Sequence, residues 1–63
     1  MAESKALLTL TETAERLRKT DKQLRWMIHA KTAPPSARIG GRRMFREADV
    51  DSWIDAQFAA EAS

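Results

Sequence analysis

Basic side chains are concentrated in the middle of this 63-residue chain. From residue 21 to residue 46, seven of them stand against the single acid Asp21, a net charge of +6, whereas residues 47–63 carry five acids and no base. The seven are Lys22, Arg25, Lys31, Arg38, Arg42, Arg43 and Arg46. Guanidinium and ammonium groups at this density neutralise phosphates and release the counterions condensed on a polyanion. The chemistry that they favour is binding to nucleic acid.

Residue types that carry out catalysis or hold metal ions are scarce. The chain has no Cys, and His29 is its one imidazole, which is too few for a His-based zinc site. No nucleophile with its base, no catalytic pair of carboxylates and no phosphate-cradling loop can be identified. We therefore expect a protein that is not an enzyme and that needs neither a cofactor nor a metal ion.

Length and hydropathy predict one small soluble domain. A chain of this size buries only about 60% of the surface that it exposes when unfolded, so its core is small. No apolar run approaches the roughly 20 residues that cross a bilayer, and the N-terminus lacks the pattern of a signal peptide. We expect a cytoplasmic protein in which residues 1–63 form one domain, with flexible ends at 1–6 and 59–63.

Two capping boxes predict two short helices. In Thr9-Leu10-Thr11-Glu12 and in Thr20-Asp21-Lys22-Gln23, the first and last side chains are spaced to bond each other's backbone N–H groups. The first helix is expected to start near Leu10 and to end near Arg18. The second is expected to be over by about Thr32, because the rings of Pro34-Pro35 cannot continue it.

The second predicted helix has two different faces. At about 100° per residue, one arc collects Leu24, Met27, Ile28 and the stem of Lys31, which we assign to the core. The opposite arc is basic and aromatic, and it holds Lys22, Arg25, Trp26 and His29. For any single residue of that arc, an ordinary solvated helix face is an equally good interpretation. An exposed Trp26 is expected to contact DNA, a protein partner or the edge of the neighbouring hairpin.

A hairpin and a third helix complete the predicted chain. Short strands on either side of Gly40-Gly41-Arg42 indicate a two-stranded ribbon, because glycines supply the positive φ of tight turns. A third helix is expected from about Arg46 or Glu47 to Phe58, where apolar residues from Val50 onward recur at helical spacing, and we assign Trp53 to the core on that stripe. The elements predict a mainly α fold with a small β-hairpin, a winged helix-turn-helix in the order helix, helix, two-stranded wing, helix.

In such a fold the second helix enters the major groove, while the wing follows the backbone or the minor groove. We expect the recognition helix to contact DNA through Asp21, Lys22, Gln23, Arg25, Trp26 and His29, and the wing to do so through Arg38, Gly40, Gly41, Arg42 and Arg43. Contacts to the DNA backbone are expected from Arg16, Arg18, Lys19, Thr20 and Arg46.

From about Leu7 to Phe58 the chain resembles the MerR-like winged helix-turn-helix domains of phage excisionases, and it is most similar to the small excisionases of mycobacteriophages. The resemblance rests on the stretch from Leu8 to Leu17, on Thr20, on Pro34, on Arg38-Ile39-Gly40-Gly41-Arg42-Arg43 and on Asp49-Val50-Asp51-Ser52-Trp53-Ile54. The chain departs from the family at two places. Its turn is Arg18-Lys19-Thr20, whereas relatives often begin this turn with a Gly. It also has Trp26 at a position where relatives commonly have an Arg. Base preference therefore does not transfer.

The resemblance implies a recombination directionality factor. Such proteins bind and bend phage attachment-site DNA, often cooperatively on repeated sites, and direct a tyrosine integrase toward prophage excision. The expected partners are double-stranded DNA, the integrase and, on DNA, further copies of the protein itself. We expect the protein to be monomeric in solution and to work in the nucleoid of a bacterial host cell. The acidic third helix is expected to face a neighbouring copy or the integrase. Two alternatives are a small phage transcriptional repressor that binds an operator, and a protein-interaction adaptor that uses the acidic helix.

Overall fold

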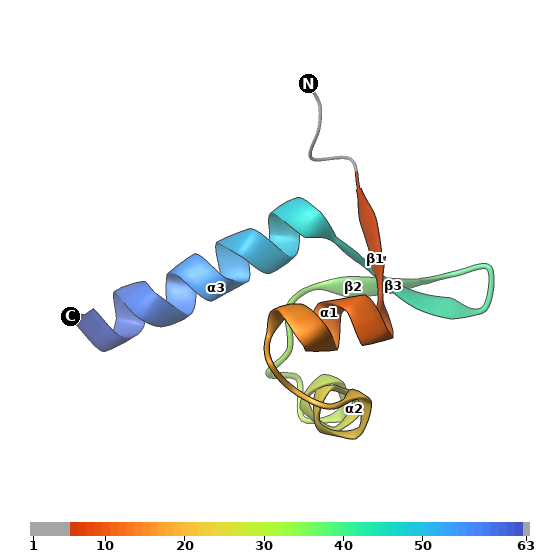
Figure 1. Cartoon of the computed structure of the whole chain (residues 1–63), viewed down its shortest axis with the longest axis horizontal. Coiled ribbons are helices and arrows are strands. Elements are labelled where there is room, and N and C mark those ends of the chain that lie inside the picture. The colour runs from red at the N-terminus through yellow and green to blue at the C-terminus, as the bar shows by residue number, and fades with distance from the viewer. Residues whose placement is uncertain (1–5, 63) are drawn as a thin grey trace.

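The computed structural model describes residues 6–62 (Figure 1). Of the two ends that the sequence predicts to be flexible, positions 1–5 and position 63 lie outside the described residues. Three helices and a three-stranded antiparallel sheet, in the strand order β1-β3-β2, make up the fold. In chain order the elements are β1 Leu7–Thr9, α1 Leu10–Arg16, α2 Asp21–His29, β2 Ser36–Ile39, β3 Arg42–Arg46 and α3 Glu47–Ala62. This arrangement confirms the predicted winged helix-turn-helix.

Helices α1 and α2 start where the capping boxes predict. The Thr9 hydroxyl accepts a hydrogen bond from the Glu12 backbone N–H at 3.1 Å, and the Glu12 carboxylate accepts one from the Thr9 N–H at 2.8 Å. Thr20 and Gln23 repeat the same pair of bonds at 3.1 and 2.9 Å. Backbone donors that have no partner inside a helix are thereby satisfied at both N-termini.

Both helices also end in the same way, with a basic residue in the left-handed backbone region. Arg18 has a φ of 59° and Lys31 a φ of 63°. After α1, the Lys19 N–H donates to the Ala14 carbonyl at 2.8 Å, and after α2 the Thr32 N–H donates to the Met27 carbonyl at 2.9 Å. These are the long bonds of the Schellman motif, which places Arg18 and Lys31 at the position that usually holds glycine.

The wing is the hairpin of β2 and β3, closed by Gly40 and Gly41 with φ values of 60° and 84°. Two consecutive positive φ values form the turn that matches the twist of a two-residue hairpin. A third strand, β1, was not predicted. It pairs with β3 so that Leu8 lies opposite Phe45, and the Glu47 N–H donates to the Ala6 carbonyl at 3.0 Å just beyond that ladder.

The core is small and draws on five of the six elements. One fully or nearly fully buried apolar residue comes from each of β1, α1, α2, β3 and α3, namely Leu8, Ala14, Leu24, Phe45 and Val50. Partly buried apolar side chains surround this centre, among them Met27 and Ile28 of α2 and Ile54 of α3. Trp53, which the sequence assigns to the core, is half-buried and is not part of that packed group.

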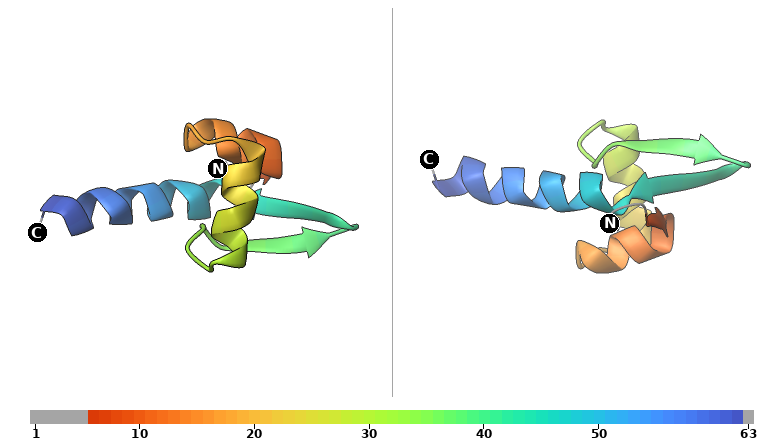
Figure 2. Two further views of the ribbon diagram at one scale, coloured as in Figure 1. Left: turned by 90° about the horizontal axis from the view of Figure 1, so that it is seen from below. Right: turned by 90° about the horizontal axis from the view of Figure 1, so that it is seen from above.

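Helix α3 and the tip of the wing project from the body in opposite directions, and α2 crosses beneath the body between them (Figures 1 and 2). The helix continues through Ala62, four residues past its predicted end at Phe58, so residues 59–62 are helical and not the loose end that the sequence suggested. Phe58 is 72% exposed on this projecting part. The distal half of α3 therefore adds little to the core.

Candidate nucleic-acid interface

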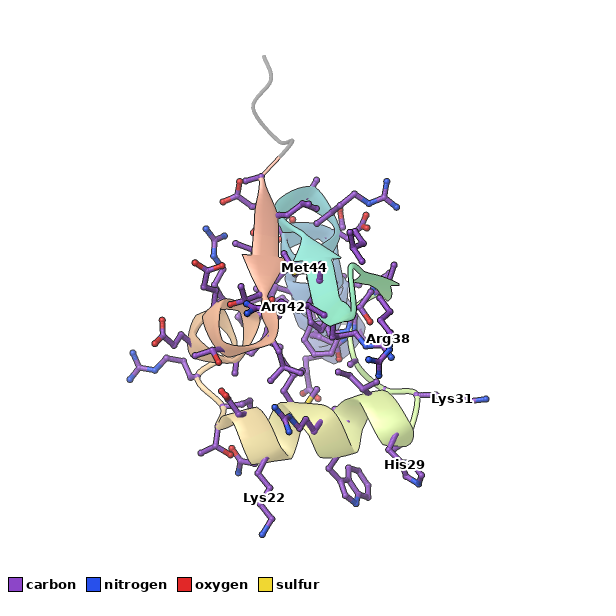
Figure 3. All side chains as sticks on the ribbon, turned by 90° about the vertical axis from the view of Figure 1, so that its right-hand side faces the viewer. Lys22, His29, Lys31, Arg38, Arg42 and Met44 are labelled. Carbon is purple, nitrogen blue, oxygen red and sulfur yellow. The ribbon has the colours of Figure 1, made fainter. Side chains whose placement is uncertain are left out.

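The outer face of α2 is free of internal partners, as its sequence predicts. Lys22 and His29 point from α2 away from the sheet (Figure 3). Arg25 and Trp26 are exposed as well, and Trp26 keeps 66% of its surface accessible, so it does not pack against the edge of the wing. The assignment of the Lys31 stem to the core is wrong, because α2 ends at His29 and Lys31 is exposed beyond that end.

Two of the predicted base-reading residues are instead tied to the protein. The Thr11 hydroxyl donates to the Asp21 carboxylate at 2.8 Å, which links α1 to α2. The Gln23 carbonyl oxygen accepts from the Thr20 N–H within the capping box. A bidentate contact to adenine uses both the oxygen and the NH2 group of an amide, and here the oxygen is already engaged. The polar and aromatic side chains of α2 that remain available for DNA are thus Lys22, Arg25, Trp26 and His29.

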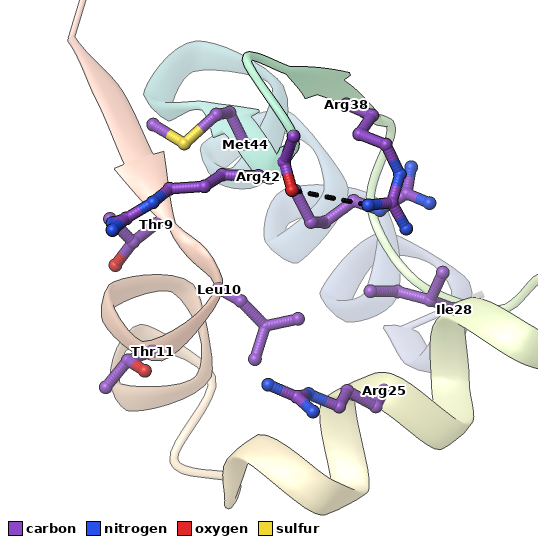
Figure 4. Close-up of a pocket in the computed structure, with 10 residues that line it drawn as sticks. Thr9, Leu10, Thr11, Arg25, Ile28, Arg38, Arg42 and Met44 are labelled. Atoms are coloured by element: carbon purple, nitrogen blue, oxygen red, sulfur yellow. Dashed lines mark hydrogen bonds between the residues drawn. The ribbon is translucent and has the colours of Figure 1, made fainter.

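Arginines from α2 and from the wing meet along one groove. An open groove of about 530 Å³ lies between the helix-turn-helix and the hairpin, and its lining includes Arg25, Arg38, Arg42 and Arg43 (Figure 4). Leu10 of α1 and Ile28 of α2 supply apolar wall between these charged groups. Four cations along one channel can hold a chain of phosphates, since each guanidinium presents several donors to phosphate oxygens.

Within the wing, the arginines differ in how they are held. Arg38 donates to the Gly41 carbonyl at 3.3 Å and so braces the turn. Arg43 donates to the Ser36 hydroxyl across the hairpin at 3.3 Å. Arg42 starts beside the turn but extends along the sheet toward Thr9, and not outward from the tip (Figure 4). The wing thereby directs a cation into the groove, and Gly40 and Gly41 at the tip carry no side chain.

Two of the residues predicted to touch the DNA backbone form ion pairs with the acidic helix. Arg16 reaches Glu47 at 2.6 Å and Asp51 at 3.5 Å, and so connects α1 to α3. Arg46 pairs with Asp49 at 3.0 Å. Of the remaining three, Arg18 and Lys19 are exposed in the turn between the helices, and Thr20 serves as the N-cap of α2.

Sequence reasoning missed several residues that shape the groove. Its lining also includes Thr9, Leu10, Thr11, Ile28 and Met44, none of which was predicted to be part of the site. Met44 and Thr9 come together because β1 pairs with β3, a contact between segments 35 positions apart. The order of residues 42–46, two bases, two apolar residues and one base, gives no sign of this pairing in the sequence.

Other kinds of site are not found in the part of the chain that the structure describes. Between residues 6 and 62, no helix combines the length and the apolar character that a membrane span needs. No three His, Asp or Glu side chains in that range come close enough together to hold a metal ion.

Comparison with known proteins identifies the domain type. A family model described as a helix-turn-helix domain matches residues 7–57, which run from β1 into α3. No curated protein matches the chain significantly, and no solved structure does either.

Proposed function

This chain belongs to the helix-turn-helix domain family, whose members bind DNA in a sequence-specific manner, and we propose that it acts as an excisionase, a DNA-bending accessory factor of site-specific recombination. The observation that carries the DNA-binding part is the groove lined by Arg25, Arg38, Arg42 and Arg43, which lies directly beside the exposed outer face of α2. The excisionase part is supported by the resemblance of the sequence from Leu7 to Phe58.

In the proposed complex, α2 lies in the major groove of the duplex. Lys22, Trp26 and His29 face the base edges, where Lys binds guanine and an aromatic ring packs on a thymine methyl, while Arg25 points into the groove between the helix-turn-helix and the hairpin. The DNA strand that separates the major groove from the next minor groove then passes between α2 and the wing. Its phosphates meet the arginines of the groove, and the turn of the wing reaches the minor groove.

The acidic helix gives this proposal its protein partners. Glu47, Asp49 and Asp51 in the first half of α3 form ion pairs with Arg16 and Arg46, which leave one negative charge unbalanced. The distal half presents Asp55, Phe58 and Glu61, two acids and an exposed aromatic ring on a projecting helix. A surface of this kind suits a basic, partly apolar face on a neighbouring copy or on a tyrosine integrase, because complementary charge steers association. Such a contact would make binding to repeated sites cooperative.

DNA binding itself is tested by titrating labelled duplex with protein at several salt concentrations. We expect Arg25→Ala and Arg42→Ala each to lower affinity and to make the slope of log K against log salt shallower by about 1, the value for one phosphate contact. Asp55→Asn on distal α3 raises the net charge by one, so the double variant Arg42→Ala/Asp55→Asn has the net charge of the unaltered protein and should keep the shallower slope. Affinity that is insensitive to salt, or recovery of the slope in the double variant, would contradict the interface.

The excisionase role is tested by footprinting on phage attachment-site DNA with and without integrase. Protection of spaced direct repeats, a ladder of complexes in gel shifts and stimulation of excision are the expected results. A small transcriptional repressor is the second candidate, supported by the exposed Phe58 and Leu7, which a dimer would cover. Protection of a palindrome by a protein that is already dimeric in solution would favour the repressor.

A further inference from the structure

Two exposed basic residues occupy backbone conformations that destabilise the fold. A left-handed φ brings Cβ close to the following carbonyl oxygen in every residue except glycine, and Arg18 and Lys31 both adopt it at the ends of helices. Glycine at either position would remove the strain and keep the same capping bonds. In so small a domain, two avoidable costs of this kind point to a use for the side chains.

Internal interactions do not explain the choice of Arg and Lys. Within residues 6–62, neither side chain makes a hydrogen bond or an ion pair, and both residues are exposed. The negative end of each helix dipole favours a cation nearby, but a position within the last turn serves for this on unstrained backbone, as Arg16 does in α1. The strained residues therefore have no evident role inside the folded protein.

Their positions relative to α2 suggest the role. Arg18 lies two residues before the N-cap Thr20, and Lys31 directly follows the C-cap Ala30, so the two bracket α2. Lys31 projects beyond the C-terminal end of the helix (Figure 3). A helix of nine residues is about 13.5 Å long, and the major groove is about 12 Å wide. A basic side chain beyond each end is thus placed to reach the phosphates on the two borders of the groove.

We infer that Arg18 and Lys31 are a pair of phosphate anchors, one for each strand that borders the major groove, and that together they fix how α2 sits in it. The inference rests on the proposed DNA-binding function and adds Lys31 to the interface. In this inference, the contact of each side chain with a phosphate is the reason that the strain is retained. Because phosphates are the same in every sequence, the anchors set position and affinity and leave base preference unchanged.

Two substitutions at each position separate charge from strain. Lys31→Gln and Arg18→Gln remove the charge and keep the strained backbone, so we expect an unchanged Tm, a salt slope shallower by about 1 and affinity lower by about eightfold at 0.1 M salt. Lys31→Gly and Arg18→Gly remove both, so the same loss of affinity should accompany a Tm higher by about 4 °C. Adding Asp55→Asn, a change on distal α3, to Lys31→Gln restores the net charge of the protein and should not restore the salt slope.

The outcomes distinguish this inference from the proposed function. If Arg42→Ala makes the salt slope shallower and the two Gln variants do not, the inference of phosphate anchors is refuted, whereas the proposed DNA binding stands. If the unaltered protein shows no salt-dependent binding to duplex DNA, the proposed function itself fails. A Gln variant that changes the ranking of DNA sequences would show base reading at that position, and Gly variants that fail to raise Tm would remove the argument from strain. Either result overturns the inference.

Discussion

Arg16→Ala separates an internal role for this residue from a contact with DNA. Arg16 bonds Glu47 at 2.6 Å and Asp51 at 3.5 Å, and the side chains of Arg16 and Glu47 are 39% and 29% exposed. Exposed ion pairs contribute about 0.2–1 kcal/mol, so the half-buried pair with Glu47, the weaker one with Asp51 and the lost packing of the Arg stem together give about 1 kcal/mol. For a domain of this size, that lowers Tm by about 4–8 °C.

The assay is thermal unfolding followed by far-UV circular dichroism, at low salt and at 1 M salt. The deficit of Arg16→Ala should shrink at 1 M, where charges are screened over about 3 Å. Arg46→Ala is the internal comparison, because Arg46 is 71% exposed and among the described residues pairs only with Asp49, so its removal should cost less. In a binding assay held well below Tm, Arg16→Ala should keep its affinity for DNA. An unchanged Tm together with weaker binding at that temperature would refute the reasoning and return Arg16 to the DNA backbone.

Three further substitutions test other parts of the fold. Thr13→Val should raise stability by about 1 kcal/mol in denaturant titrations, because the Thr13 hydroxyl is buried and has no partner among the described residues; a loss would show that the hydroxyl is satisfied. Gly41→Ala should lower stability by about 1 kcal/mol through its φ of 84°, with no steric clash, since an added Cβ meets nothing within 4 Å; equal stability would contradict this. Trp26→Ala should leave Tm unchanged and weaken DNA binding, and the opposite pair of results would place Trp26 in the core.

Features fixed by neighbouring residues could be predicted from the sequence. Each capping box needs only residues three apart, and both start their helices at the expected residue. The turn of the wing follows from two adjacent glycines whose backbone other residues rarely adopt. The two faces of α2 follow from helical periodicity, with Leu24 buried and Lys22 exposed.

Features that depend on distant partners were missed. Strand β1 has three residues, and what makes it a strand is its pairing with β3. The internal roles of Arg16 and Arg46 became visible only when α3 was placed beside α1 and β3. The end of α3 was misjudged for another reason, because the apolar stripe stops at Phe58 while Ala and Glu, which favour helix, continue to Ala62.

The pairing of β1 with β3 also bears on the order in which the protein folds. Helices α1 and α2 make contacts between residues close in sequence, which form rapidly, whereas Leu8 meets Phe45 only after a loop of more than 30 residues has closed. During synthesis, β1 must wait unpaired until β3 has left the ribosome. We therefore expect the helix-turn-helix to form early in folding and the wing to reach its final position beside it late.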